Sequence, residues 1–235
     1  MQILSVSLAA LSFIAALSIS TPLAAAESDG LALAIVYDTS GSMRDTVRDD
    51  QGKQTMKYLI ANRALATVAN QIEAYAKNQG GAPRTVHAAL YTFQGNNAQA
   101  VIPFGPFDAN AIRDWANRFA NPNGATPLGN AINVATKTVL KSPLSRKHIL
   151  VVTDGMNTAG PRPETLLPAL KKQATQQGTP FSVHFVAFDV DAKIFEPVKK
   201  LDATVVSAAD EKQLNTQLDY ILQQKILLED EEPKK

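Results

Sequence analysis

The apolar run LALAIVY, residues Leu31–Tyr37, is followed directly by the polar pentapeptide DTSGS, residues Asp38–Ser42. A continuous hydrophobic run of this length is typical of a strand buried on both faces of a parallel sheet. In open α/β sheets, ligands bind just beyond the carboxyl ends of such strands. The two segments therefore predict a buried parallel strand and a polar loop at the edge where binding sites form.

Oxygen-bearing side chains alternate along this pentapeptide, at Asp38, Ser40 and Ser42. One carboxylate and two hydroxyls suit a hard divalent cation, which prefers oxygen ligands. The pattern D-x-S-x-S fixes only three positions, so about one chain in ten or twenty of this length would carry it by chance. Taken alone, the pentapeptide is better explained as a polar turn after a strand.

The composition is that of an ordinary folded protein: 235 residues, 45% hydrophobic and 19% charged, with 23 basic and 22 acidic side chains. These values exclude a wholly disordered chain and favour a single domain with one core. The net charge of +1 gives no reason to expect nucleic acid as a partner. Cysteine is absent, which excludes a disulfide framework and a lipid attached through an N-terminal cysteine.

Residues 1–26 differ from the rest because they carry no charged side chain. Leu4–Ile19 is apolar, and Thr21–Ala26 breaks a helix and ends in small residues that suit cleavage before Glu27. We expect a signal peptide here, and a periplasmic or secreted protein of a bacterial envelope. The alternative is an uncleaved anchor, since about 20 apolar residues span a bilayer; only then would a membrane be a partner.

Strand and helix patterns alternate along residues 27–228, which we expect to form the domain, with residues 229–235 as a charged, solvated tail. Further strands are expected at Thr85–Phe93, Ala100–Phe104, Lys147–Thr153, Phe181–Phe188 and Thr204–Ser207. Helices are expected from an N-cap at Thr55 to about Tyr75, and at Asp108–Phe119, Pro127–Lys141, Pro163–Gln177, Lys193–Leu201 and Asp210–Leu228. The alternation predicts an α/β fold: a three-layer, Rossmann-like, doubly wound and mostly parallel sheet with helices on both faces. A short link at Gly95–Asn97 predicts one antiparallel edge strand.

Two further loops place oxygen atoms at the same edge of the expected sheet. Thr126 lies in GATPL before a helix, and Asp154 lies in VVTDG after a strand. Each has a simpler explanation alone: Thr126 as an N-cap with Pro127 at the first helical position, and Asp154 with Gly155 as a turn pair. Together with the pentapeptide, the two loops predict one joint site.

On these residues the sequence resembles a von Willebrand factor type A (vWA) domain with a metal-ion-dependent adhesion site (MIDAS). The matching residues are Asp38, Ser40 and Ser42 in DTSGSM, Thr126 in GATPL, and Asp154 in VVTDG. The resemblance extends from about residue 31 to 228 and is closer to bacterial members than to integrin-type ones. The segment at residues 43–54 departs from the family because it is longer than the usual connection to the first helix.

The resemblance implies a divalent cation, Mg2+ first and Mn2+ or Ca2+ as alternatives. It implies that Ser40 and Ser42 bind the ion directly, that Asp38 and Asp154 bind it directly or through water, and that Thr126 joins in one conformational state. An Asp or Glu of a partner protein would complete the shell. The implied function is thus a metal-dependent protein-binding module for adhesion or assembly, not an enzyme.

Residues 43–54 contain Asp45, Asp49 and Asp50, which are further candidate ligands, although a solvated polar loop is the favoured interpretation. The three histidines, His87, His148 and His184, fall in or beside expected strands, and His87 and His184 fit core or edge positions better than ligand positions.

Two alternatives to the binding module stay open. One is a metal-dependent hydrolase, because a bound cation lowers the pKa of water. The sequence offers no nucleophile elbow, cysteine nucleophile or phosphate-binding glycine loop for it. The other is a structural envelope protein whose site has lost its function.

Overall fold

The computed structural model describes residues 28–79 and 81–228, so the predicted signal peptide and the charged tail lie outside the described residues. Within these two ranges, none of the helices combines the length and apolar character that crossing a membrane requires. The domain boundaries at residues 27 and 228 therefore stay a prediction.

A six-stranded sheet forms the middle layer, in the order β5-β4-β1-β6-β7-β8. Its strands are β1 (Ser28–Tyr37), β4 (Val86–Gln94), β5 (Asn97–Pro106), β6 (Leu144–Thr153), β7 (Ser182–Phe188) and β8 (Thr204–Ala208). All neighbours pair in parallel except β4 and β5, which are antiparallel at one edge. The predicted sheet and its antiparallel edge strand are confirmed.

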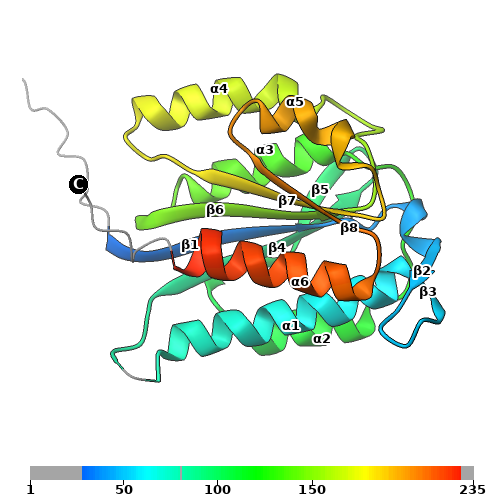
Figure 1. The fold of residues 1–235 in the computed structure, drawn as a ribbon. Coiled ribbons are helices and arrows are strands. Elements are labelled where there is room, and N and C mark those ends of the chain that lie inside the picture. The colour runs from blue at the N-terminus through cyan, green and yellow to red at the C-terminus, as the bar shows by residue number, and fades with distance from the viewer. Residues whose placement is uncertain (1–27, 80, 229–235) are drawn as a thin grey trace, which may run out of the picture.

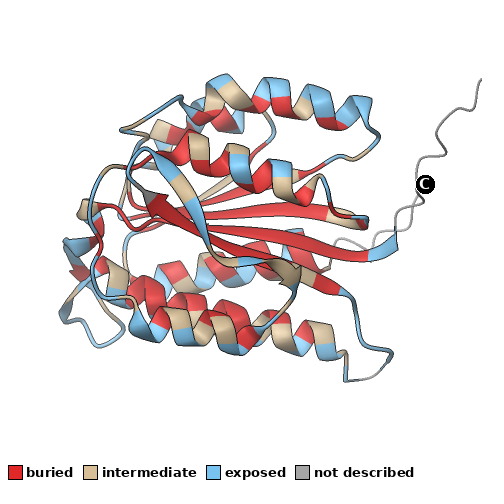
Figure 2. Ribbon diagram, turned by 180° about the vertical axis from the view of Figure 1, so that it is seen from behind, coloured by how far each residue is buried: buried red, intermediate tan, exposed pale blue. Residues whose placement is uncertain are grey.

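Helices cover both faces of this sheet (Figure 1). One face carries α1 (Lys57–Lys77), α2 (Ala109–Arg118) and α6 (Glu211–Ile221), and the other carries α3 (Leu128–Val139), α4 (Pro163–Gln176) and α5 (Glu196–Lys199). The inner strands of the sheet are buried between these layers, as the red strands of Figure 2 show, whereas the edge strand β5 is half-buried or exposed.

Strand β1 contributes to both hydrophobic cores because successive side chains point to opposite faces. Leu33 and Ile35 pack with α1, α2 and α6, whereas Ala32 and Ala34 pack with α3 and α4. All of these side chains are fully buried. The continuous apolar run is therefore explained by burial on both faces, as the sequence predicts.

The polar segment before α1 is not the open loop that the sequence predicts. A short 3-10 helix, η1 (Gly41–Arg44), is followed by an antiparallel hairpin of β2 (Thr46–Arg48) and β3 (Gln54–Met56). The Asp49 carboxylate accepts hydrogen bonds from the backbone N–H of Gln51 and Lys53 and from the Thr55 hydroxyl. Asp49 therefore builds the hairpin turn, and the predicted N-cap role of Thr55 is wrong.

Helix boundaries differ from the prediction in three more places. Pro127 is itself the N-cap of α3, so it does not occupy the first helical position. The expected helix at residues 193–201 is divided into the 3-10 helix η2 (Ala192–Phe195) and α5. The last helix begins where it is expected, with Asp210 as the N-cap of α6, but a π-helix, η3 (Leu222–Leu227), replaces its last turns.

Candidate metal centre

The candidate site lies at the carboxyl edge of the sheet, where β1 and β6 end side by side. Asp38 directly follows β1, Asp154 directly follows β6, and Thr126 lies in the loop before α3. Asp38 is completely buried, and Asp154 is 5% exposed. Ser42 is exposed, so the site opens to solvent on the side of η1.

Asp38 is held by hydrogen bonds at both carboxylate oxygens. Oδ1 accepts from the backbone N–H of Ser40 at 2.8 Å, and Oδ2 accepts from the Thr153 hydroxyl at 2.5 Å. Burial, followed by the nearby charge of Asp154, raises the pKa of Asp38 from 3.8 to about 6, despite these hydrogen bonds. The surroundings of Asp38 and Asp154 therefore do not fully stabilise two negative charges at this point.

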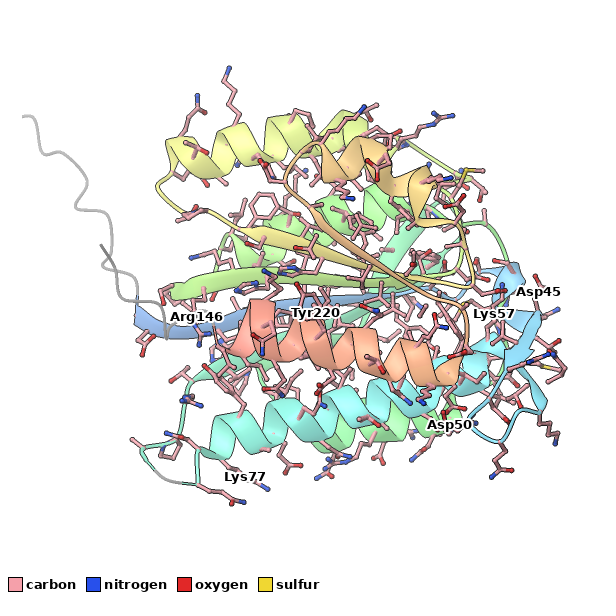
Figure 3. All side chains as sticks on the ribbon, viewed as in Figure 1. Asp45, Asp50, Lys57, Lys77, Arg146 and Tyr220 are labelled. Atoms are coloured by element: carbon pink, nitrogen blue, oxygen red, sulfur yellow. The ribbon has the colours of Figure 1, made fainter. Side chains whose placement is uncertain are left out.

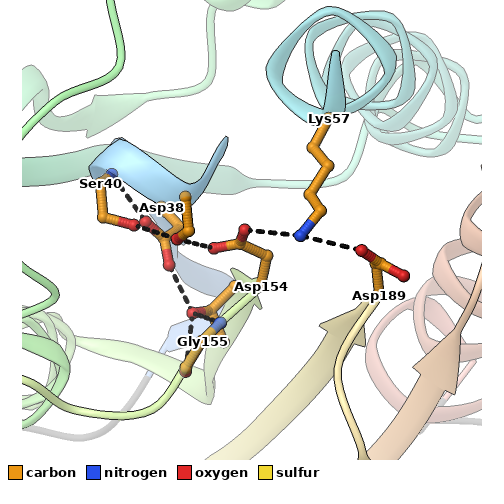
Figure 4. A network of polar contacts seen from close by, with 8 residues as sticks. Asp38, Ser40, Lys57, Asp154, Gly155 and Asp189 are labelled. Carbon is orange, nitrogen blue, oxygen red and sulfur yellow. Dashed lines mark hydrogen bonds and ion pairs between the residues drawn. The ribbon is translucent and has the colours of Figure 1, made fainter. Parts of the chain in front are cut away.

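A row of oxygen atoms leads from the pentapeptide to Asp154 (Figure 4). The hydroxyl oxygens of Ser40 and Ser42 are 3.1 Å apart, and the Ser42 hydroxyl donates to Asp154 Oδ1 at 2.8 Å. The loop after β1, which contains the pentapeptide, is thus in direct contact with the loop after β6, which contains Asp154.

The Thr126 hydroxyl lies near Gly155, the residue that follows Asp154. A Cβ atom placed on Gly155 would be 3.9 Å from both Ser42 Oγ and Thr126 Oγ1, so the two hydroxyls flank this glycine. The Thr126 backbone is fixed on both sides by Thr158, which donates its N–H to the Thr126 carbonyl and accepts the Thr126 N–H. All five sequence-predicted site residues therefore come together at one edge of the sheet.

Backbone hydrogen bonds hold the loop before α3 against the pentapeptide. Gly41 N–H donates to the Gly124 carbonyl at 3.0 Å, and Asn123 N–H donates to the Thr39 carbonyl at 2.8 Å. The Thr39 hydroxyl in turn accepts from the N–H of Phe93 on β4. The positions of the site oxygens are thus set by main-chain contacts between neighbouring loops.

This donor set fits a hard divalent cation. Its atoms are all oxygen, from two carboxylates and three hydroxyls, and Mg2+ combines few protein oxygens with bound waters. In residues 28–79 and 81–228, no group of three or more His, Cys, Asp or Glu side chains is placed so that it could hold a metal ion. The surplus negative charge at Asp38 is what a bound cation would neutralise.

Two charged residues that the sequence analysis did not single out also meet at this site. Lys57, the first residue of α1, is 4% exposed and places Nζ 3.1 Å from Asp154 Oδ2 and 2.9 Å from Asp189 Oδ2. Burial lowers the pKa of Lys57, but the contacts with Asp189 and Asp154 outweigh it and raise the pKa overall. Two features of the sequence point to these residues. Asp189 directly follows a strand, β7, and Lys57 lies in the first turn of a helix, where the helix dipole disfavours a lysine.

The other candidate residues have different surroundings. Asp45 and Asp50 are exposed, and Asp50 lies toward α6 in Figure 3, away from Lys57. His148 Nδ1 lies 3.1 Å from His184 Nε2 between β6 and β7, and both rings are buried. His87 packs edge-on against Phe104. The three histidines therefore occupy core and edge positions, as expected for His87 and His184.

Solved structures with the same fold include several proteins of surface appendages. The PilB minor pilin of Streptococcus sanguinis matches with a TM-score of 0.63 at 16% identity, over 83% of this chain and 61% of that chain. The vWF domain of the type V pili tip protein Mfa5 of Porphyromonas gingivalis matches with a TM-score of 0.59 at 12% identity, over 83% of this chain and 94% of that chain.

A third match is proximal thread matrix protein 1 from the mussel byssus, solved with a zinc-occupied MIDAS motif. Its TM-score is 0.58 at 15% identity, over 83% of this chain and 48% of that chain. This chain thus spans less than two thirds of the pilin and of the mussel protein. Identities this low establish the shared fold alone, and no curated protein matches the sequence.

The family comparison is more specific. The family model of the von Willebrand factor type A domain matches residues 33–157, which is more than half of the chain. The matched segment contains the pentapeptide, Thr126 and Asp154. The chain therefore belongs to the von Willebrand factor type A domain family.

Proposed function

We propose that this protein is an exported binding module that docks a partner protein through a divalent cation, with Mg2+ as the first choice. The cation would be held by Asp38, Ser40, Ser42, Thr126 and Asp154. The observation that carries this proposal is the convergence of these oxygen atoms, from three separate loops, at one solvent-accessible point of the sheet edge.

The neutral hydroxyl ligands of the site favour capture of an acidic side chain by the bound ion. The serine and threonine ligands are neutral, so an ion bound mainly through Ser40 and Ser42 keeps much of its positive charge. The exposure of Ser42 leaves room on the solvent side, and Mg2+ readily keeps exchangeable positions in its shell. An Asp or Glu of the partner would fill such a position and complete the shell.

Thr126 and Asp154 supply a possible two-state element. Asp154 already accepts from Ser42 and from Lys57, whereas the Thr126 hydroxyl lies beside Gly155. A shift of direct metal contact from one residue to the other would move the loop that leads into α3. Partner binding would then favour one arrangement of this loop, as a population shift requires.

The comparisons support this proposal by analogy. Two of the matched structures belong to pilus proteins, and a third carries zinc at its MIDAS. Together with the signal-peptide pattern of residues 1–26, the pilus proteins favour a location in the bacterial envelope or outside the cell.

The Asp38→Ala variant tests the proposal. Removal of this carboxylate should abolish Mg2+-dependent capture of the partner from the envelope fraction of the native host, with an unchanged circular dichroism spectrum. Asp114→Ala is the matched control, because Asp114 is exposed on α2 and loses the same charge. Its capture should equal that of the wild type.

Three results would contradict the binding module. Equal capture of the partner in excess EDTA would show that binding does not depend on a divalent cation. Steady hydrolysis of phosphoesters by the purified protein, lost in Asp38→Ala, would favour a metal-dependent hydrolase instead. An absence of any thermal shift with Mg2+, Mn2+ or Ca2+ would leave only a structural role, because a ligand that binds the native state stabilises it.

A further inference from the structure

The ion pair network of Lys57 joins the candidate metal centre to the end of a third strand. Its ammonium group contacts Asp154 on one side and Asp189 on the other (Figure 4). The Asp154 side chain is fully buried, that of Lys57 is 5% exposed, and that of Asp189 is 41% exposed. The network thus runs from the interior of the site to its surface.

Asp189 is held in place by an uncommon backbone conformation. Its φ of 53° lies in the left-handed region, which non-glycine residues rarely adopt and which Asp and Asn tolerate best. Its N–H donates to the carbonyl of Ala208 at the end of β8, at 2.7 Å. The fold therefore fixes the backbone of Asp189 at the end of β7, from which its carboxylate reaches Lys57 Nζ at 2.9 Å.

Asp154 divides its two carboxylate oxygens between Lys57 and the proposed ligands. Oδ1 accepts from the Ser42 hydroxyl, whereas Oδ2 faces the Lys57 ammonium. A cation on the Ser42 side and the ammonium on the other side would share one carboxylate. The cation and the ammonium are both positive and would lie on either side of a single carboxylate, so they would repel each other, most strongly where water is excluded.

We propose that Lys57 is a built-in counter-ion that weakens cation binding at this site and keeps it reversible, and that Asp189 moderates this effect by drawing the ammonium away from Asp154. The inference rests on the proposed function, because it concerns the same metal centre. It assigns Lys57 and Asp189 to the control of metal affinity.

A purely structural role of Lys57 predicts the opposite sign. If Lys57 only oriented Asp154, its removal would misplace a ligand and lower the affinity. If Lys57 is a competing positive charge, its removal leaves both Asp154 oxygens available to the metal and raises the affinity for Mg2+. The direction of the change therefore separates the two roles.

The experiment is a calorimetric titration of four variants of the full domain with Mg2+. We expect Lys57→Met to bind Mg2+ about tenfold more tightly and Asp189→Asn about threefold more weakly than the wild type. Lys57→Arg keeps the charge and should stay within about twofold of the wild type. Lys77→Met is the matched control, because Lys77 lies at the other end of α1 (Figure 3) and should leave the affinity unchanged.

Equal or weaker Mg2+ binding by Lys57→Met would overturn the inference. If the loss of Lys57 prevents folding, Asp189→Asn decides alone, and unchanged or tighter binding by that variant would overturn it. If the wild type binds Mg2+ and the variants do not show the expected changes in affinity, the counter-ion role of Lys57 is refuted and the proposed function stands. If Lys57→Met binds Mg2+ and the wild type does not, the counter-ion role is supported. If neither protein binds Mg2+ at millimolar concentration, the metal centre is refuted as well.

Discussion

Asp38 combines complete burial with hydrogen bonds at both carboxylate oxygens. Such bonds lower the pKa of a carboxyl, yet burial and the charge of Asp154 prevail and raise the pKa of Asp38 to about 6. In the metal-free protein, folding therefore works against the charged form of this residue. A bound cation would relieve that cost, which links metal binding to both stability and pH.

The first prediction concerns the pH dependence of the metal-free protein. The folded-state pKa of Asp38, about 6, lies above the ordinary value of 3.8, so the folded state binds the proton more tightly than the unfolded state does. The contribution of Asp38 to the free energy of unfolding is therefore fully present below pH 4 and is lost as pH rises through 6. The loss should be roughly 3 kcal/mol.

Urea unfolding in EDTA between pH 4 and pH 7.5 measures this contribution. The difference between the wild type and Asp38→Asn isolates it from the other titrating groups. With saturating Mg2+, the loss above pH 6 should be largely restored. A difference that is flat, or that grows in favour of the wild type as pH rises, would contradict the prediction.

At this scale, the sequence identified Asp38, Ser40, Ser42, Thr126 and Asp154 because each lies in a loop next to the end or start of an expected element. It did not identify Lys57. The contacts of Lys57 depend on where α1 begins, and the sequence predicts the N-cap at Thr55, whereas Met56 is the N-cap. A shift of one residue rotates a helical side chain by about 100°, so a lysine pairing cannot be read from such a boundary.

At the scale of elements, the start of α3 lies tightly against the loop that follows Asp154. Gly129 N–H donates to the Asn157 side chain at 3.0 Å. A Cβ atom at Gly129 would lie only 2.0 Å from the carbonyl oxygen of Pro161. Gly129 therefore permits a close contact between a helix and a loop that both lead away from the site.

We expect Gly129→Ala to destabilise the protein by about 1–3 kcal/mol, because the overpacking outweighs the better helix propensity of alanine. The movement of α3 should also weaken Mg2+ binding, since Thr126 lies only two residues before this helix. Gly105→Ala on β5 is the matched control, because its Cβ would contact nothing within 4 Å. Its effect should stay within about 0.5 kcal/mol. Equal stability of the two variants in urea unfolding would refute this packing argument.

The main elements were predictable because long apolar patterns define them, whereas the hairpin of β2 and β3 was not. Its strands have three residues each, too few to show an alternation. Its stability comes from the Asp49 side chain, which gathers two N–H groups and a hydroxyl. In sequence, a charged segment that is ordered by one of its own carboxylates cannot be distinguished from a solvated loop.

At the scale of the whole molecule, three neighbouring strands of the sheet end in the same way. β1, β6 and β7 are adjacent and parallel, and each is followed directly by an aspartate: Asp38, Asp154 and Asp189. Lys57 supplies the positive charge among them. The sheet topology thus concentrates three aspartates at one edge, and Lys57 pairs with two of them.

The sequence predicted this architecture well because β1 is buried on both faces, and only a covered parallel sheet explains such a strand. What it could not predict is the charge balance at the edge. That balance depends on which strands are neighbours in space, and the order β1-β6-β7 brings together residues separated by more than a hundred positions.

The most direct test of the metal centre is anomalous diffraction from crystals of this protein grown with millimolar Mn2+. We expect a strong anomalous peak at the carboxyl edge of the sheet, within coordination distance of the Ser40 and Ser42 hydroxyls, and its loss in Asp38→Ala. Absence of a peak between these hydroxyls, or manganese bound only elsewhere on the protein, would refute the metal centre.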